Sequence, residues 1–254
     1  MPLAPTNESG QPPASTQSHA TAAVRRLELL PDTITSIGLL AGCYSLISSI
    51  SGHYASAGLM IGISIVFDVA DGLVARASRS ASQFGLEYDS LSDVVAFGVA
   101  PATLAYAWAL QPLGPWAIFV VGAFVICAAL RLARFNIQVG TPGGKPRFVG
   151  LPVPGAAAMI AGVLFGYRYF ALDSPLALCV AMTLLILMLA GLMVSRVPYP
   201  SIKGIDWRSW ASLRNLVVLA VVMAVFIATP ELMAFAIGTG YLLSGPLLFV
   251  IDRA

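Results

Sequence analysis

Long apolar runs, separated by short polar or turn-forming segments, account for most of the chain after about residue 34. Eight of these runs are long enough to cross a bilayer as a helix, which takes about 20 residues. They cover approximately residues 34–51, 55–75, 88–110, 114–135, 151–170, 175–194, 212–229 and 232–250. The pattern therefore predicts an all-α fold, a polytopic bundle of about eight transmembrane helices.

Two segments precede the first apolar run. Residues 1–20 are polar and rich in Pro, Ser, Thr and Ala, a composition that predicts a disordered cytoplasmic tail. Residues 21–31 could form a short amphipathic helix on the membrane surface, and a plain solvated linker is the alternative. We expect Pro31 and Asp32 to end this segment and to cap the first span. Residues 32–254 would then form the transmembrane domain.

Composition and charge support a membrane protein. Of the 254 residues, 58% are hydrophobic and only 10% are charged, which excludes an ordinary soluble domain. If the N-terminus is inside, thirteen of the fourteen basic residues fall in inner segments and only Arg168 falls outside. Basic residues favour the cytoplasmic side, so both ends of the chain are predicted to be cytoplasmic. The three cysteines lie in separate apolar runs without metal-type spacing.

Charged positions interrupt the apolar pattern most strongly between Asp68 and Asp93. The stretch reads D-x-x-D-G-x-x-A-R, then eight residues, then G-x-x-x-D-x-x-x-D, and it holds five of the chain's twelve carboxylates. Asp68 and Asp71 are three residues apart, and Asp89 and Asp93 are four apart, so each pair lies on one helix face. Carboxylates at a bilayer are energetically costly, and such a cluster indicates a functional site.

We expect the two helices to be antiparallel neighbours joined by the polar link 76–85, which would bring the four carboxylates together. Four converging carboxylates repel one another unless cations lie among them, and all-oxygen ligation favours Mg²⁺ or Mn²⁺. Gly72 and Ala75 keep the adjacent surface small, and Arg76 and Arg79 add positive charge that suits a phosphate. An acidic membrane-surface loop without a ligand is the alternative.

This spacing resembles the signature of the CDP-alcohol phosphotransferase family, and each fixed position of that signature is filled. The resemblance implies a two-metal site held by Asp68, Asp71 and Asp89. It also implies that Asp93 is the general base and a ligand of the second metal. No histidine lies near the cluster, since His19 and His53 are elsewhere.

The resemblance also implies a nucleotide site. The family's nucleotide-contacting positions match Thr35, Gly72, Arg76 and Ser82, with Ala75 and Gly85 leaving room for cytidine, and with Asp32 at one further position. Asp32 is a departure, because many members have Asn there in a P-N-x-x-T motif.

A second informative stretch, RLARFN at 131–136, precedes KPRFVGLPVPG at 145–155. Within the family, these segments and SRVPYPSIK at 195–203 resemble the bacterial membrane-bound phosphatidylserine synthases. The resemblance implies transfer of a phosphatidyl group from CDP-diacylglycerol to L-serine, with CMP released. It makes Arg131, Arg134, Lys145 and Arg147 candidates for binding the serine carboxylate or the lipid phosphate, although positive-inside residues would look the same.

The orientation predicted from the basic residues places the acidic site at the cytoplasmic face. The resemblance further implies a homodimer in the bacterial inner membrane, and we expect no nucleic-acid partner. Three alternatives stay open. The first is another acceptor alcohol, such as glycerol 3-phosphate, inositol phosphate or an archaeal-type lipid substrate. The second is a divalent-cation transporter, although transporter sites usually lie near the bilayer midplane. The third is a structural membrane scaffold, which gives no account of the signature.

Overall fold

The computed structural model describes residues 14–78, 82–139, 150–167, 174–197 and 239, and these form helices joined by short turns, with no strand among them. The all-α prediction is confirmed for this part of the chain. Four helical segments are long and apolar enough to cross a membrane: Pro31–Ile50, Tyr54–Gly72, Gln83–Ile137 and Pro175–Val194. Apart from residue 239, the predicted runs 212–229 and 232–250 lie outside the described residues, so eight spans with both ends inside stay a prediction.

The first two helices, α1 (Ala14–Ile50) and α2 (Tyr54–Ser78), form an antiparallel hairpin. The chain turns at Gly52, whose φ of 77° suits a residue without a side chain. Buried hydroxyls join the pair: Ser45 Oγ donates to the Ala57 carbonyl at 2.9 Å, and Ser64 Oγ donates to the Gly38 carbonyl at 2.8 Å. Small residues and hydroxyl hydrogen bonds are typical of packed transmembrane helices.

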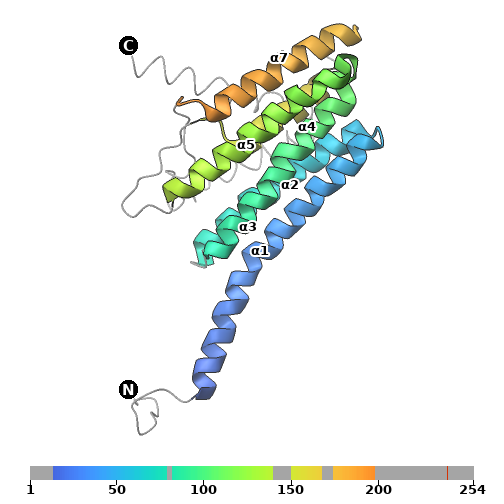
Figure 1. Cartoon of the computed structure of the whole chain (residues 1–254). Coiled ribbons are helices and arrows are strands. Elements are labelled where there is room, and N and C mark those ends of the chain that lie inside the picture. The colour runs from blue at the N-terminus through green and yellow to red at the C-terminus, as the bar shows by residue number, and fades with distance from the viewer. Residues whose placement is uncertain (1–13, 79–81, 140–149, 168–173, 198–238, 240–254) are drawn as a thin grey trace, which may run out of the picture.

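The expectation that Pro31 and Asp32 end one helix and cap the next is wrong. Helix α1 begins at Ala14, within the predicted tail, and runs through Pro31. Its N-terminal part extends beyond the other helices (Figure 1). Proline removes one backbone donor, and the Pro31 carbonyl lies 3.0 Å from Thr35 Oγ1, one turn further along the helix. The helix therefore continues across both predicted segment boundaries.

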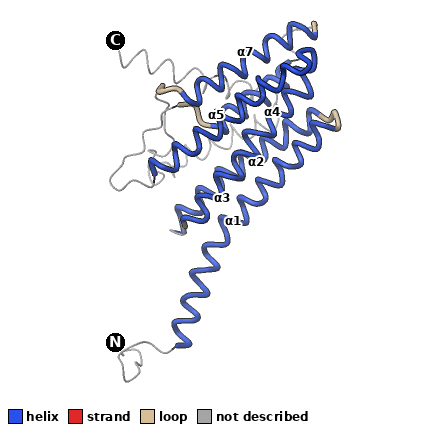
Figure 2. Tube along the Cα trace, viewed as in Figure 1, coloured by secondary structure: helices blue, strands red, loops and turns tan. Residues whose placement is uncertain are grey.

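The third predicted span is one continuous helical path (Figure 2), and it includes two π-helical segments. It consists of α3 (Gln83–Asp93), the π-helix η1 (Val94–Val99), α4 (Ala100–Ala105) and the π-helix η2 (Tyr106–Leu110). Pro101 cannot donate a hydrogen bond to the preceding turn, which is consistent with the π-helix just before it. The path begins at Gln83, earlier than the expected residue 88, because Ser82 caps it by accepting from Gly85 N at 3.0 Å.

The chain then reverses through the short 3-10 helix η3 (Gln111–Trp116), where Gly114 has a φ of 54°. Helix α5 (Ala117–Val139) returns, and α6 (Val153–Gly166) and α7 (Pro175–Val194) complete the described bundle. The apolar stretch from Gln83 to Ile137 thus holds two of the predicted spans. Large buried side chains fill the space between these helices, among them Phe97, Phe124, Ile160 and Met182.

The ends of several helices meet at one end of the bundle. The C-terminal ends of α2, α5 and α7 and the N-terminal end of α3 all lie there (Figure 1). The acidic stretch and the basic residues of α5 are thereby brought to the same side, although they are far apart in the sequence.

Candidate active site

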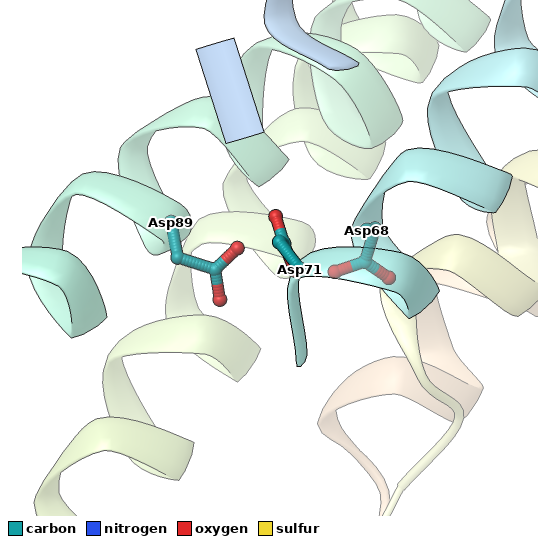
Figure 3. Close-up of side chains that lie close together, drawn as sticks. All are labelled: Asp68, Asp71 and Asp89. Carbon is teal, nitrogen blue, oxygen red and sulfur yellow. The ribbon is translucent and has the colours of Figure 1, made fainter. Parts of the chain in front are cut away.

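Three aspartates from two helices converge at this end of the bundle. Asp68 and Asp71 come from the last turns of α2, and Asp89 comes from α3 (Figure 3). One carboxylate oxygen from each lies within 4.8 Å of the others. Asp71 is buried, and the other two are half-buried. The spacing argument for convergence is therefore matched by the geometry of these three side chains.

Helix α1 forms a third wall that the sequence did not predict. It packs against both α2 and α3, which make little direct contact with each other. A Cβ on Gly42 would lie 2.8 Å from Ala96 Cα, and a Cβ on Gly85 would lie 3.1 Å from Asp32 Oδ1. Glycines at these two positions allow α1 and the third span to approach closely.

Thr35 ties α1 to the acidic cluster. Its Oγ1 lies 2.6 Å from Asp71 Oδ2 and donates to it, and the same hydroxyl is 3.0 Å from the Pro31 carbonyl. Both Thr35 and Asp71 are buried. A hydrogen bond to a carboxylate favours its charged form and fixes its orientation.

Asp93 lies one turn after Asp89, at the C-terminal end of α3, and is only 9% exposed. Its carboxylate is not part of the group of three, but it lines the same small, open cavity. The charges of Asp68, Asp71, Asp89 and Arg131 all act on it. The four predicted carboxylates thus face a single cavity.

The cavity suits divalent metal ions. Carboxylate oxygens are the donors that Mg²⁺ and Mn²⁺ prefer, and the donor set contains no sulfur or imidazole. Four carboxylates gathered beside apolar helices would repel one another strongly. Among the residues that the structure describes, Arg131 is the cation whose charge acts on Asp93, and one positive charge does not balance four negative ones. Bound cations would remove this repulsion.

The positions that the sequence assigned to nucleotide binding lie beside the carboxylates. Asp32, Thr35, Ser82 and Gly85 gather where α1 meets the start of α3. Gly72 and Ala75 follow Asp71 on α2 and are half-buried. Arg76 is on α2, and its side chain lies outside the description. Ser82 Oγ accepts the capping hydrogen bond from Gly85 N, a helix-starting role that the sequence analysis did not foresee.

The four basic candidates separate into different environments. Arg131 acts on Asp93 and stacks on the Phe135 ring, with its guanidinium carbon 5.5 Å from the ring centroid. Arg134 instead donates from Nη1 to the Val194 carbonyl at 3.3 Å, at the C-terminal end of α7. Lys145 and Arg147 lie outside the described residues.

Sequence reasoning did not single out several polar residues of this region. Ser64 and Ser92 line the cavity, and each shares a helix face with an aspartate, since Ser64 is four residues before Asp68 and Ser92 is three after Asp89. That periodicity could have identified them.

Asn136 was missed as well, although it belongs to the RLARFN stretch. Its Nδ2 lies 2.9 Å from Ser90 Oγ and 3.5 Å from Glu87 Oε2, which links α5 to α3. It holds α3 beside α5 at the level of the acidic cluster.

Comparisons with known proteins agree with this geometry. A model of the CDP-alcohol phosphatidyltransferase family matches residues 28–196. The chain is 34% identical to a CDP-diacylglycerol–serine O-phosphatidyltransferase of Helicobacter pylori over 200 residues, which cover 78% of this chain and 83% of the relative. It is 33% identical to the Bacillus subtilis protein of the same name over 70% of this chain and 93% of the relative. It is 36% identical to an archaetidylserine synthase of Methanothermobacter thermautotrophicus over 69% of this chain and 71% of that protein. The matched residues contain the whole acidic cluster and all three walls of its cavity, and the chain belongs to the CDP-alcohol phosphatidyltransferase family.

Proposed function

We propose that this protein is a CDP-diacylglycerol–serine O-phosphatidyltransferase, which makes phosphatidylserine and CMP from CDP-diacylglycerol and L-serine. The observation that carries the proposal is the single cavity lined by Asp68, Asp71, Asp89 and Asp93, in a chain whose relatives include enzymes with that name. These carboxylates occupy the family's signature positions.

Asp68, Asp71 and Asp89 would hold the divalent metal, Mg²⁺ or Mn²⁺, with Asp93 as a further ligand of a second ion. When bound, the metal neutralises charge on the pyrophosphate of the nucleotide lipid. The Thr35 hydroxyl orients Asp71 for this task. Asp32, Thr35, Gly72, Ala75, Arg76, Ser82 and Gly85 form the proposed nucleotide site beside it.

Asp93 takes the proton from the serine hydroxyl. The serine oxygen then forms a bond to the β-phosphorus, which bears diacylglycerol. The bond from that phosphorus to the oxygen bridging to the α-phosphate breaks, and CMP leaves with the electron pair. The protein's own contribution is mostly positioning and electrostatics, as in other phosphoryl transfers.

Among the basic candidates, Arg131 is the one that we assign to the serine carboxylate. It is close enough to Asp93 for their charges to interact, so a carboxylate that it bound would place the serine hydroxyl near the base. We assign Arg134 a structural role at the C-terminal end of α7, because its guanidinium donates to the Val194 carbonyl. A cation at that end also interacts favourably with the helix dipole. Lys145 and Arg147 remain candidates for the lipid phosphate.

The membrane setting completes the proposal. The acidic cavity lies at the end of the bundle that also carries Arg131 and Arg134, and basic residues favour the cytoplasmic side. We therefore infer a cytoplasmic site in the bacterial inner membrane, which the two acyl chains reach from the bilayer. The homodimer implied by the family resemblance is part of the same proposal, and cross-linking in native membranes would test it.

A panel of acceptors tests the assignment. Purified protein is incubated with CDP-diacylglycerol, Mn²⁺ and either L-serine, glycerol 3-phosphate or inositol phosphate, and CMP release is measured. The proposal predicts release that depends on L-serine, with phosphatidylserine formed in equal amount. Release with a phosphorylated acceptor alone would assign a different alcohol to the same site. Ion flux through liposomes without CMP release would indicate a transporter.

A further inference from the structure

Three hydroxyls line the acidic cavity, and only two of them are hydrogen-bonded within the described part of the chain. Thr35 donates to Asp71, and Ser64 donates to the Gly38 carbonyl. Ser92 is 4% exposed, and its Oγ has no hydrogen-bond partner among the residues that the structure describes. A buried hydroxyl without a partner is rare in folded proteins, and this one lines the cavity that the four aspartates share.

Other helical hydroxyls nearby show what Ser92 does not do. Serine and threonine within helices commonly donate to the carbonyl four residues earlier. Ser36 and Ser90 do so here, with distances of 2.7 and 3.0 Å to the carbonyls of Asp32 and Leu86. The Ser92 hydroxyl makes no such bond, so its proton is available to a ligand in the cavity.

Ser92 lines the same cavity as the proposed base, Asp93. It shares a helix face with Asp89 and with Ala96, which packs on Gly42 of α1. Gly38, one turn before Gly42, also lines the cavity. A Cβ there would lie 3.3 Å from Phe67 Cβ, so this glycine lets α1 pack closely on α2 beside Ser64.

We propose that Ser92 donates a hydrogen bond to the oxygen of the acceptor alcohol, and this inference rests on the proposed function. The carboxylates of the cavity are acceptors only, and the hydrogens of Thr35 and Ser64 are already engaged. The acceptor oxygen gains negative charge as Asp93 removes its proton. A donor aimed at that oxygen stabilises the charge until the bond to phosphorus forms. Ser92 keeps its own proton throughout.

The test compares Ser92→Ala with Ser92→Thr, which retains the hydroxyl, and with Ser64→Ala, a matched loss of a cavity hydroxyl that is bonded to backbone. Each variant is measured for kcat and KM with L-serine, for KM with CDP-diacylglycerol, and for Mn²⁺-dependent CMP affinity. We expect Ser92→Ala to lower kcat/KM for serine by about 10- to 100-fold, with CMP affinity and the CDP-diacylglycerol KM within about twofold of wild type. Ser92→Thr should recover part of the loss, and Ser64→Ala should show no selective loss with serine.

Two results would overturn the inference. One is a Ser92→Ala variant with wild-type kcat/KM. The other is a loss of CMP affinity in parallel with turnover, which would mean that Ser92 only supports the shape of the site. If the wild type binds CMP but ignores serine, the proposed acceptor is wrong, and the same comparison is made with the alcohol that the wild type does use. The wild-type control thus distinguishes a failure of the Ser92 inference from a failure of the proposed function.

Discussion

Thr35 and Asp71 join α1 to α2 through a buried hydrogen bond of 2.6 Å. The threonine lies in the first transmembrane segment, 36 residues before the aspartate, and contributes no metal-binding carboxylate of its own. Through this bond, α1 contributes a side chain that directly contacts one of the proposed metal-binding carboxylates. Substitutions on α1 should therefore change metal and nucleotide binding.

Thr35→Val tests this coupling directly. The substitution keeps the shape of the side chain but removes the donor to Asp71, so the carboxylate loses its fixed orientation. Loss of one hydrogen bond to a charged group costs about 1.5–3 kcal/mol, so we expect Mn²⁺-dependent CMP affinity to fall by at least about tenfold. Isothermal titration calorimetry on Thr35→Val and on the control Thr35→Ser checks this. If Thr35→Val binds CMP as tightly as Thr35→Ser and the wild type do, the hydroxyl of Thr35 does not contribute to metal binding.

Gly42→Ala tests the close contact of α1 with the third span. The new Cβ would lie 2.8 Å from Ala96 Cα, a backbone atom, so the two helices must move apart. Overpacking of this kind costs about 1–3 kcal/mol, and we expect a lower Tm in detergent together with reduced activity. Gly62→Ala is the matched control, since a Cβ there meets nothing within 4 Å. A Gly42→Ala protein with wild-type Tm and turnover would argue against this contact.

Arg131→Gln and Arg134→Gln should have different effects, because the two guanidiniums have different neighbours. The charge of Arg131 acts on Asp93, and its loss should raise the KM for serine by about 10- to 100-fold with little change in the KM for CDP-diacylglycerol. Arg134 donates to the end of α7, and its loss should chiefly lower Tm. Steady-state kinetics and thermal unfolding on both variants make the comparison. A normal serine KM in Arg131→Gln would show that serine is bound elsewhere.

Asp93→Asn tests the general base. We expect kcat to fall by about 10²–10⁴, because the amide cannot accept the serine proton. CMP affinity should be much less affected, since the predicted nucleotide positions are on α1, on α2 and near the start of α3. Turnover and nucleotide affinity are measured on the same preparation. If affinity collapses together with turnover, Asp93 is chiefly a metal ligand.

The convergence of Asp68, Asp71 and Asp89 could be predicted from the sequence because its geometry is largely local. The pairs Asp68–Asp71 and Asp89–Asp93 are set by helix periodicity, and the short link between them leaves little freedom in how the two helix ends approach. The spacing therefore carried most of the information, and the three-residue cluster agrees with it.

What the sequence could not predict depends on contacts between distant segments. The closure of the site by α1 arises from Gly42 against Ala96 and Thr35 against Asp71, and no local pattern encodes these pairs. The helix also runs through Pro31, a residue that usually ends or kinks a helix. The hydroxyl of Ser92 could be recognised as available only once its neighbours were known.

The most direct test of the central claim is incorporation of labelled L-serine into lipid by the purified protein with CDP-diacylglycerol and Mn²⁺, compared with Asp89→Asn and with metal removed by chelation. Asp89 is one of the three converging carboxylates. We predict phosphatidylserine and CMP in equal amounts from the wild type, and loss of both products in the variant and in the chelated sample, with the variant still folded in detergent. Near-normal lipid labelling by Asp89→Asn, or labelling that persists without divalent metal, would contradict the account.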